Sequence, residues 1–157
     1  MRLLLVAAAA VFLTSCSSQP KQTESATPAQ KPPPPKPTDE TRRFPMANQV
    51  STRVVDDHLL DKTFMPGGTL AHYKQRKLEY DIFVTKVATP TDAAILLLDW
   101  KRAMPDAELV PSFGGYFGTD AARPVFVFAK GSWFAGIAGL PQKQADTQAR
   151  ILAARLD

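Results

Sequence analysis

The sequence contains one cysteine and two histidines in 157 residues, and its longest uninterrupted apolar run, residues 3–13, has eleven residues. A single cysteine excludes an intrachain disulfide framework and a zinc site built from spaced cysteine pairs. The apolar run is too short for a membrane-spanning helix, which needs about 20 residues. The motifs G-x-S-x-G and H-E-x-x-H are also absent. The sequence therefore assigns no catalytic residue, no metal ligands and no cofactor.

The predicted folded part also lacks an excess of charge. The whole chain carries a formal charge of +4, but most of it comes from Arg2 and from basic residues between positions 17 and 45. From Met46 onward, basic and acidic residues nearly balance. Nucleic-acid binding requires a clustered basic face, so nucleic acid is not an expected partner. The basic residues outside the domain suit contact with anionic lipid headgroups or cell-wall polymers.

The first sixteen residues carry the most specific signal in the chain. Arg2 precedes the apolar run, and Leu13-Thr14-Ser15-Cys16 follows it. These four residues resemble the lipobox of bacterial lipoproteins, in which the cysteine thiol is acylated and becomes the first residue of the mature chain. The resemblance implies a signal peptide over residues 1–15, a lipid such as palmitate on Cys16, and attachment to a cell-envelope membrane facing the periplasm or the exterior. Ser17 favours the outer membrane if the host is Gram-negative; a cleaved, unanchored secretory form is the alternative.

Residues 16–45 are predicted to be a disordered, proline-rich linker. Ser, Gln, Thr, Lys and Pro dominate this stretch, which includes the run Pro32-Pro33-Pro34-Pro35. Phe44 is its one large apolar residue, so we expect no core to form there. The simplest interpretation is a spacer between bilayer and domain, and the alternative is a proline-rich ligand for another domain or for the cell wall.

Turn residues and hydrophobic periodicity predict one domain over residues 46–157. The turn Gln75-Arg76-Lys77 separates two stretches of alternating apolar and polar residues, which indicates a β-hairpin. Thr89, Pro90 and Asp92 predict the start of a helix, and Pro105 predicts its end. The predicted strands are 69–73, 78–87, 108–113, 124–129 and 133–140, and the predicted helices are 90–104 and a C-terminal helix that opens at Pro141.

Short connections between strands require antiparallel neighbours, and the helices need a sheet face to cover. The sequence therefore predicts an α+β domain with an antiparallel sheet of about five strands and two helices packed on it. Residues 50–64 place Val54, Val55, His58 and Leu59 at helical spacing and are interpreted as an additional short helix.

Three features of the sequence are candidate sites. Residues 112–118 are rich in glycine but do not open a helix, so a glycine-bent strand or hairpin is favoured over a phosphate loop. Asp57 and Asp61 lie one helical turn apart beside His58, yet a metal ion needs further ligands, which favours a solvated face. His72 has no partner that spacing reveals.

Aromatic residues concentrate in the second half of the domain. If helices cover one face of the sheet only, Tyr116, Phe117, Phe126 and Trp133 would form an exposed surface for a ligand, a protein or a sugar polymer. If both faces are covered, these side chains belong to the core. The sequence leaves both possibilities open.

The domain contains the segments Pro66-Gly67-Gly68, Tyr73, Glu79-Tyr80-Asp81-Ile82, Thr89-Pro90-Thr91-Asp92-Ala93, 125–128, Lys130-Gly131 and Leu152-Ala153. In these segments residues 66–157 resemble a family of uncharacterised bacterial envelope proteins, a domain of unknown function. The resemblance implies no activity. We therefore expect a non-enzymatic binding or assembly module whose partner is an envelope protein or a cell-wall polymer, with a small hydrolase or modifying enzyme acting on cell-wall material, or a ligand-binding sensor, as the alternatives.

Overall fold

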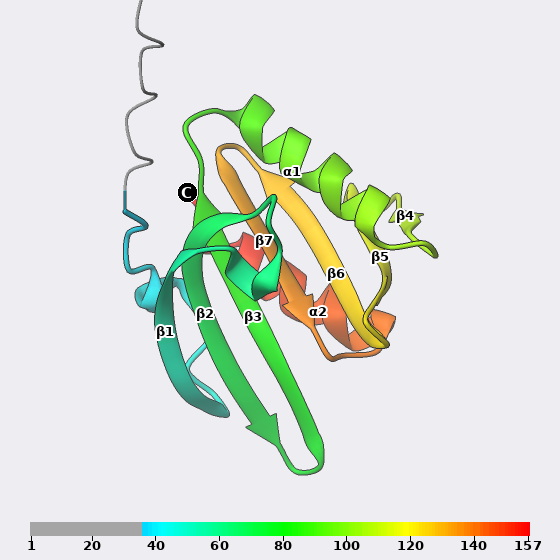
Figure 1. Ribbon diagram of the computed structural model, residues 1–157. Coiled ribbons are helices and arrows are strands. Elements are labelled where there is room, and N and C mark those ends of the chain that lie inside the picture. The colour runs from blue at the N-terminus through cyan, green and yellow to red at the C-terminus, as the bar shows by residue number, and fades with distance from the viewer. Residues whose placement is uncertain (1–35) are drawn as a thin grey trace, which may run out of the picture. The chain divides into compact units, whose positions relative to one another are not determined.

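The computed structural model describes residues 36–157 (Figure 1). Cys16, the predicted signal peptide and the linker up to residue 35 lie outside the described residues. No helix in the described part of the chain is long and apolar enough to cross a membrane.

The described residues form a seven-stranded, antiparallel sheet and two α-helices, which confirms the α+β class and the helix count (Figure 1). The strand order is β1-β2-β3-β7-β6-β5-β4, so β1 and β4 are the edges. The elements in chain order are η1 (Thr41–Arg43), β1 (Gln49–Asp57), η2 (Leu59–Asp61), β2 (Pro66–Gln75), β3 (Leu78–Lys86), α1 (Pro90–Ala103), β4 (Glu108–Val110), β5 (Gly115–Asp120), β6 (Arg123–Lys130), β7 (Trp133–Ala138) and α2 (Gln142–Ala153), where η marks a short 3₁₀ helix.

The sheet has two more strands than the sequence predicts. The helix expected within residues 50–64 is wrong, because most of that stretch is β1, in which Thr52, Val54 and Val55 are β-branched and favour a strand. The glycine-rich run 112–118 spans the β4–β5 turn and the start of β5, which confirms its interpretation as a glycine-bent strand or hairpin. Gly118 suits this position because a Cβ there would lie 3.1 Å from the Cα of Ala107.

Helix α1 begins and ends as the sequence predicts. Thr89 accepts a hydrogen bond from the Asp92 amide, and the Asp92 carboxylate accepts one from the Thr89 amide, which makes a capping box. Pro90 occupies the first turn. The helix ends before Pro105, and Met104 closes the last turn by donating its amide hydrogen to Trp100.

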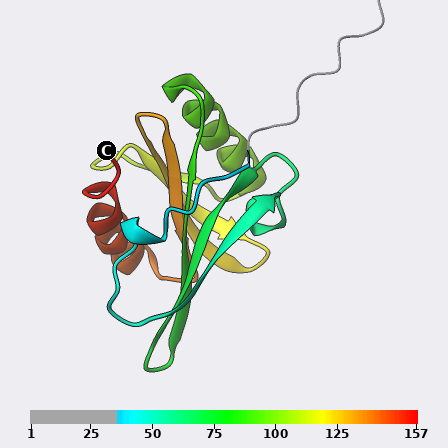
Figure 2. The ribbon, with the colours of Figure 1, turned by 90° about the vertical axis from the view of Figure 1, so that its left-hand side faces the viewer.

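The two helices cover opposite faces of the sheet, here called the α1 face and the α2 face (Figures 1 and 2). Successive residues of a strand point to opposite faces, so each central strand contributes to two cores. On β3, for example, Phe83 belongs to the core under α1 and Ile82 to the core under α2. This second cover is the reason that few aromatic side chains reach the surface.

Two further segments complete the covers. On the α2 face, the chain from Thr38 to Pro45 crosses β2: Glu40 donates its amide hydrogen to Thr69, and Tyr73 donates its hydroxyl hydrogen to the Pro45 carbonyl at 2.7 Å. Phe44, which the sequence predicts to lie in the disordered linker, is 1% exposed and belongs to the core. The ordered body of the chain therefore includes residues before Met46.

On the α1 face, the loop over residues 58–65 lies beside α1. Its Leu59 and Met65 are buried in the same core as Trp100 of α1, and the Trp100 indole donates a hydrogen bond to the Met65 sulfur at 3.1 Å. The loop leaves part of the β1–β2–β3 half of the α1 face uncovered.

Candidate functional site

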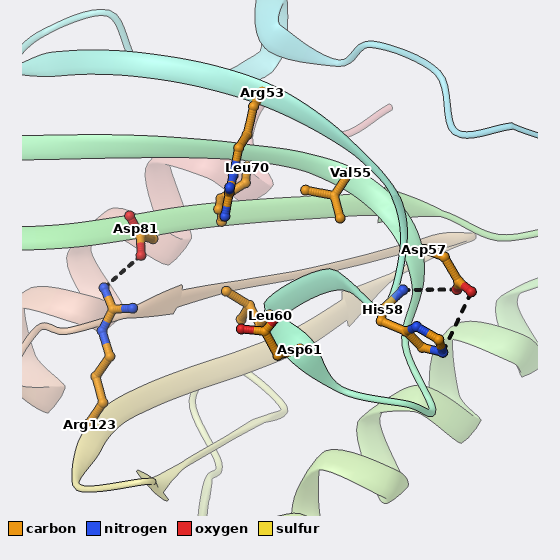
Figure 3. A pocket seen from close by; sticks show the side chains of 9 residues that line it. All are labelled: Arg53, Val55, Asp57, His58, Leu60, Asp61, Leu70, Asp81 and Arg123. Carbon is orange, nitrogen blue, oxygen red and sulfur yellow. Dashed lines mark hydrogen bonds and ion pairs between the residues drawn. The ribbon is translucent and has the colours of Figure 1, made fainter.

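A groove of about 300 Å³ opens on the α1 face, between β1, the loop over residues 58–61 and the end of the sheet where β6 begins (Figure 3). This volume is at the lower end of the range of small-molecule sites, so it suits a small ligand or a few residues of a peptide. Its lining residues are Arg53, Val55 and Asp57 of β1, His58, Leu60 and Asp61 of the loop, Leu70 of β2, Asp81 of β3 and Arg123 of β6.

Asp81 holds the polar end of the groove together. One of its carboxylate oxygens lies 2.7 Å from the Arg123 guanidinium and the other lies 2.8 Å from Nδ1 of His72. Arg123 also donates to the Ala138 carbonyl at 3.0 Å. Gly139 has a positive φ, and a Cβ at this position would lie 3.1 Å from the guanidinium, so glycine leaves the arginine its space. The Asp81 carboxylate and Arg123 are thus fixed by several contacts.

The opposite end of the groove carries less constrained charges. Arg53 forms no ion pair within residues 36–157, and its side chain extends from β1 toward Leu70 (Figure 3). Asp57 accepts a hydrogen bond from the backbone amide of His58 at 2.8 Å and lies 3.5 Å from the imidazole. The groove therefore presents both an unpaired cation and exposed carboxylates to a ligand.

The loop that forms one wall has an unusual backbone. His58, Leu60 and Asp61 all have positive φ angles, between 53° and 59°. Side chains other than glycine rarely adopt this region, and a residue held there costs on the order of 1–3 kcal/mol. The loop is anchored by Leu59, which is buried in the core under α1, and by the ion pair of Lys62 with Asp120 at 2.6 Å. The wall is therefore held in one position by contacts with distant strands.

Another ion pair lies outside the groove lining, nearer the turn of the β2–β3 hairpin. Lys74 and Glu79 face each other across β2 and β3, and their side chains form an ion pair at 2.5 Å. The hydrogen bond from Lys74 lowers the pKa of the Glu79 carboxyl below its usual value.

The aromatic surface proposed from the sequence does not form. Phe126 and Trp133 are buried in the core under α2. Tyr116 and Phe117 are half-buried and point to opposite faces, since they are neighbours in β5. The four side chains share no exposed surface because α2 and the segment around Phe44 cover one face while α1 covers the other.

The acidic stretch near residue 57 is also arranged differently from the expectation. Asp57 ends β1 and Asp61 ends η2, so the two carboxylates do not lie on one helical face. Within residues 36–157, no group of three or more His, Cys, Asp or Glu side chains is placed to hold a metal ion.

Sequence reasoning missed the pair formed by His72 and Asp81, although a signal was present. In the structure the turn is the two residues Arg76-Lys77, so Gln75 pairs with Leu78 and His72 faces Asp81. Residues directly opposite each other on antiparallel strands share a face and interact. The three-residue turn Gln75-Arg76-Lys77 predicted from the sequence would instead place His72 opposite Tyr80, so the contact follows only when the turn is one residue shorter.

Comparison of the chain with protein-family models, with curated proteins and with solved structures gave no match. The resemblance of residues 66–157 to an envelope family therefore stays a prediction, and the function has to be argued from the groove and from the N-terminal residues.

Proposed function

We propose that this chain is a lipid-anchored cell-envelope protein whose domain is a non-enzymatic binding module, and that the groove is its binding site. Leu13-Thr14-Ser15-Cys16 supports the anchor. The partner is an envelope protein segment or a cell-wall polymer, reached from a membrane through the proline-rich linker.

The observation that carries the binding role is the combination of fixed and available charge in the groove. Asp81 and Arg123 are held in place, while Arg53 and Asp61 have no ion-pair partner within the described residues. A ligand that carries both a carboxylate and an amino group finds a partner for each. Segments of peptide, including those attached to cell-wall polymers, have this chemistry.

The anchor is tested by replacing Cys16 with Ala. We expect the variant to leave the membrane fraction or to accumulate uncleaved, because one modified thiol provides the attachment. Replacement of Pro32-Pro33-Pro34-Pro35 by serine is the matched control and should leave attachment intact. Mass spectrometry of the mature N-terminus should find an acylated Cys16, and an unmodified thiol there would refute the proposal.

The groove is tested by photo-cross-linking in intact cells. A benzophenone side chain placed at Leu60, in the groove wall, should capture a defined partner, whereas the same group at the exposed Leu98 on the outer side of α1 should not. Asp81→Asn, which removes the charge shared by His72 and Arg123, should reduce capture at position 60. Equal capture at both positions, or capture unaffected by Asp81→Asn, would argue against a binding role for the groove.

One observation favours a second candidate, a small hydrolase. Ser51 of β1 lies opposite His72 of β2, and His72 lies opposite Asp81 of β3. The three side chains therefore share one face of three adjacent strands. A serine, a histidine and an aspartate in this order form the nucleophile, base and orienting group of many hydrolases. No hydrogen bond joins Ser51 and His72 within the described residues. Labelling by a fluorophosphonate that is lost in both Ser51→Ala and His72→Ala would establish this function, and an unlabelled protein would exclude it.

A further inference from the structure

The two edges of the sheet differ in their protection. Edge strand β4 has three residues and is followed directly by Pro111. Edge strand β1 has nine residues and contains neither proline nor lysine. Proteins normally blunt exposed edges with short strands, proline or lysine, because an open edge pairs with other strands. The edge formed by β1 is long and has neither proline nor lysine, and the charges that it carries are those of Arg53, Asp56 and Asp57.

β1 is also regular over most of its length. Its irregularity is confined to the first residues, between Gln49 and Ser51, and the register with β2 is unbroken from Ser51 to Asp57. Two of its valines are unusually exposed, Val50 at 60% and Val54 at 41%. No strand pairs with the outer side of β1 within residues 36–157.

We infer that β1 pairs with β1 of a second copy of this chain, antiparallel, with Val55 on the two-fold axis. An axis normal to the sheet makes one residue face its own copy and keeps the α1 faces of both copies on the same side. With Val55 at the centre, Arg53 of each copy faces Asp57 of the other. The dimer therefore gains two cross-strand pairs of opposite charge on either side of a valine pair.

The charge pattern selects this register over its neighbours. Centring the axis on Arg53 or on Asp56 places like charges opposite each other. Centring it on Val54 places Arg53 opposite Val55 and leaves both Arg53 and Asp57 without a charged partner. Both charges are available for such pairing in the single copy. Within the described residues, Arg53 forms no ion pair and Asp57 forms one, with its neighbour His58.

Pairing in this register also brings two grooves together. Arg53, Val55 and Asp57 belong to the groove lining as well as to the edge strand, and both grooves open on the α1 face. The joined sheet therefore presents two adjacent grooves on one surface, with the valine pair between them.

The inference is tested by disulfide cross-linking of the full-length chain in its membrane. Directly opposed residues on antiparallel strands have Cα atoms about 4.5–5.5 Å apart, within the reach of a disulfide. Val55→Cys should therefore give a dimer on oxidation. Val54→Cys is the matched control, because its two copies would lie about 8 Å apart in this register. The wild-type chain, with Cys16 as its single cysteine, gives the background.

Charge exchange tests the register itself in the Val55→Cys background. Arg53→Asp alone, or Asp57→Arg alone, should lower the dimer yield about tenfold, because like charges then face each other. The double variant should restore the yield, since the opposite charges are then exchanged. Arg76→Asp, in the β2–β3 turn, is the control for a change of net charge and should leave the yield unchanged.

Several outcomes would overturn the inference. No dimer from Val55→Cys means that this edge does not self-pair, and equal dimer from Val54→Cys means that contact is not in this register. Failure of the double charge variant to recover would remove the role of Arg53 and Asp57. Cross-linking of Val55→Cys to a different protein alone would show that another strand occupies the edge.

Discussion

Phe44 lies in the part of the chain that the sequence assigns to the linker, yet the structure buries it. The residue is 1% exposed and shares a core with Tyr73 of β2 and Leu156 near the C-terminus. The Arg155 guanidinium donates to the Phe44 carbonyl at 3.1 Å, and Tyr73 donates to the neighbouring Pro45 carbonyl at 2.7 Å. If these contacts hold the segment on the sheet, truncating the Phe44 side chain will destabilise the whole domain.

Replacing a buried phenylalanine by alanine typically costs 3–5 kcal/mol. We expect Phe44→Ala to lower the free energy of unfolding by about 3 kcal/mol, the lower end of that range, because the segment around Phe44 can detach from the sheet instead of leaving a rigid cavity. This loss is a large fraction of the 5–15 kcal/mol typical of a domain. Urea unfolding of the chain lacking residues 1–16, followed by tryptophan fluorescence, measures it.

Met46, two residues further along, is 85% exposed and provides the control. Met46→Ala should change the free energy of unfolding by less than about 0.5 kcal/mol, as expected for a surface substitution. A Phe44→Ala effect as small as the Met46→Ala effect would refute the reasoning and would place the start of the folded domain at residue 46, where the sequence predicted it.

Two other perturbations test the two cores. Burial raises the pKa of the Tyr73 and Tyr80 hydroxyls, so the folded domain retains protons that the unfolded chain releases above about pH 10. The free energy of unfolding should be independent of these groups at neutral pH and should fall as the pH rises beyond 10. In alkaline urea titrations, Tyr73→Phe should make this fall shallower. An unchanged slope would contradict a raised pKa of the Tyr73 hydroxyl in the folded domain. On the other face, a methyl group on Gly136 would overlap the Phe83 ring and lie 2.6 Å from the Phe126 carbonyl oxygen. Gly136→Ala should therefore lower the free energy of unfolding by about 1–3 kcal/mol, seen as a lower thermal midpoint. Gly131→Ala is the comparison. A Cβ there meets no atom within 4 Å, so this variant tests the backbone strain of a positive φ alone.

The elements that the sequence predicted are those with local signals. The α1 helix was found because Thr89, Pro90 and Asp92 form its cap within four residues. The β2–β3 hairpin was found because its turn and both strands are contiguous. Strand β1 was missed because Val54, Val55 and Leu59 also fit a helix, and its strand form depends on pairing with β2, which lies beyond the loop over residues 58–65.

The groove could not be assembled from the sequence for a related reason. Its residues come from four strands and one loop, and their proximity depends on the strand order, in which β7 lies between β3 and β6. Arg123 reaches Asp81 across β7, a contact that no spacing encodes. The contact of His72 with Asp81 is the exception, because it follows from the register of one hairpin.

The covers of the sheet explain why both proposals concern β1. Helix α1 and the loop over residues 58–65 protect much of one face, and α2 with the segment around Phe44 protects the other. An open edge or an uncovered face of a sheet can still bury backbone and apolar surface against a ligand or another chain. In this domain the open edge and the uncovered face meet at Arg53, Val55 and Asp57, which line the groove and form the outer strand. Binding in the groove and pairing of β1 therefore compete for, or share, the same charges. Because such coupling is reciprocal, a ligand that changes the dimer yield of Val55→Cys must itself bind with an affinity that depends on dimerisation.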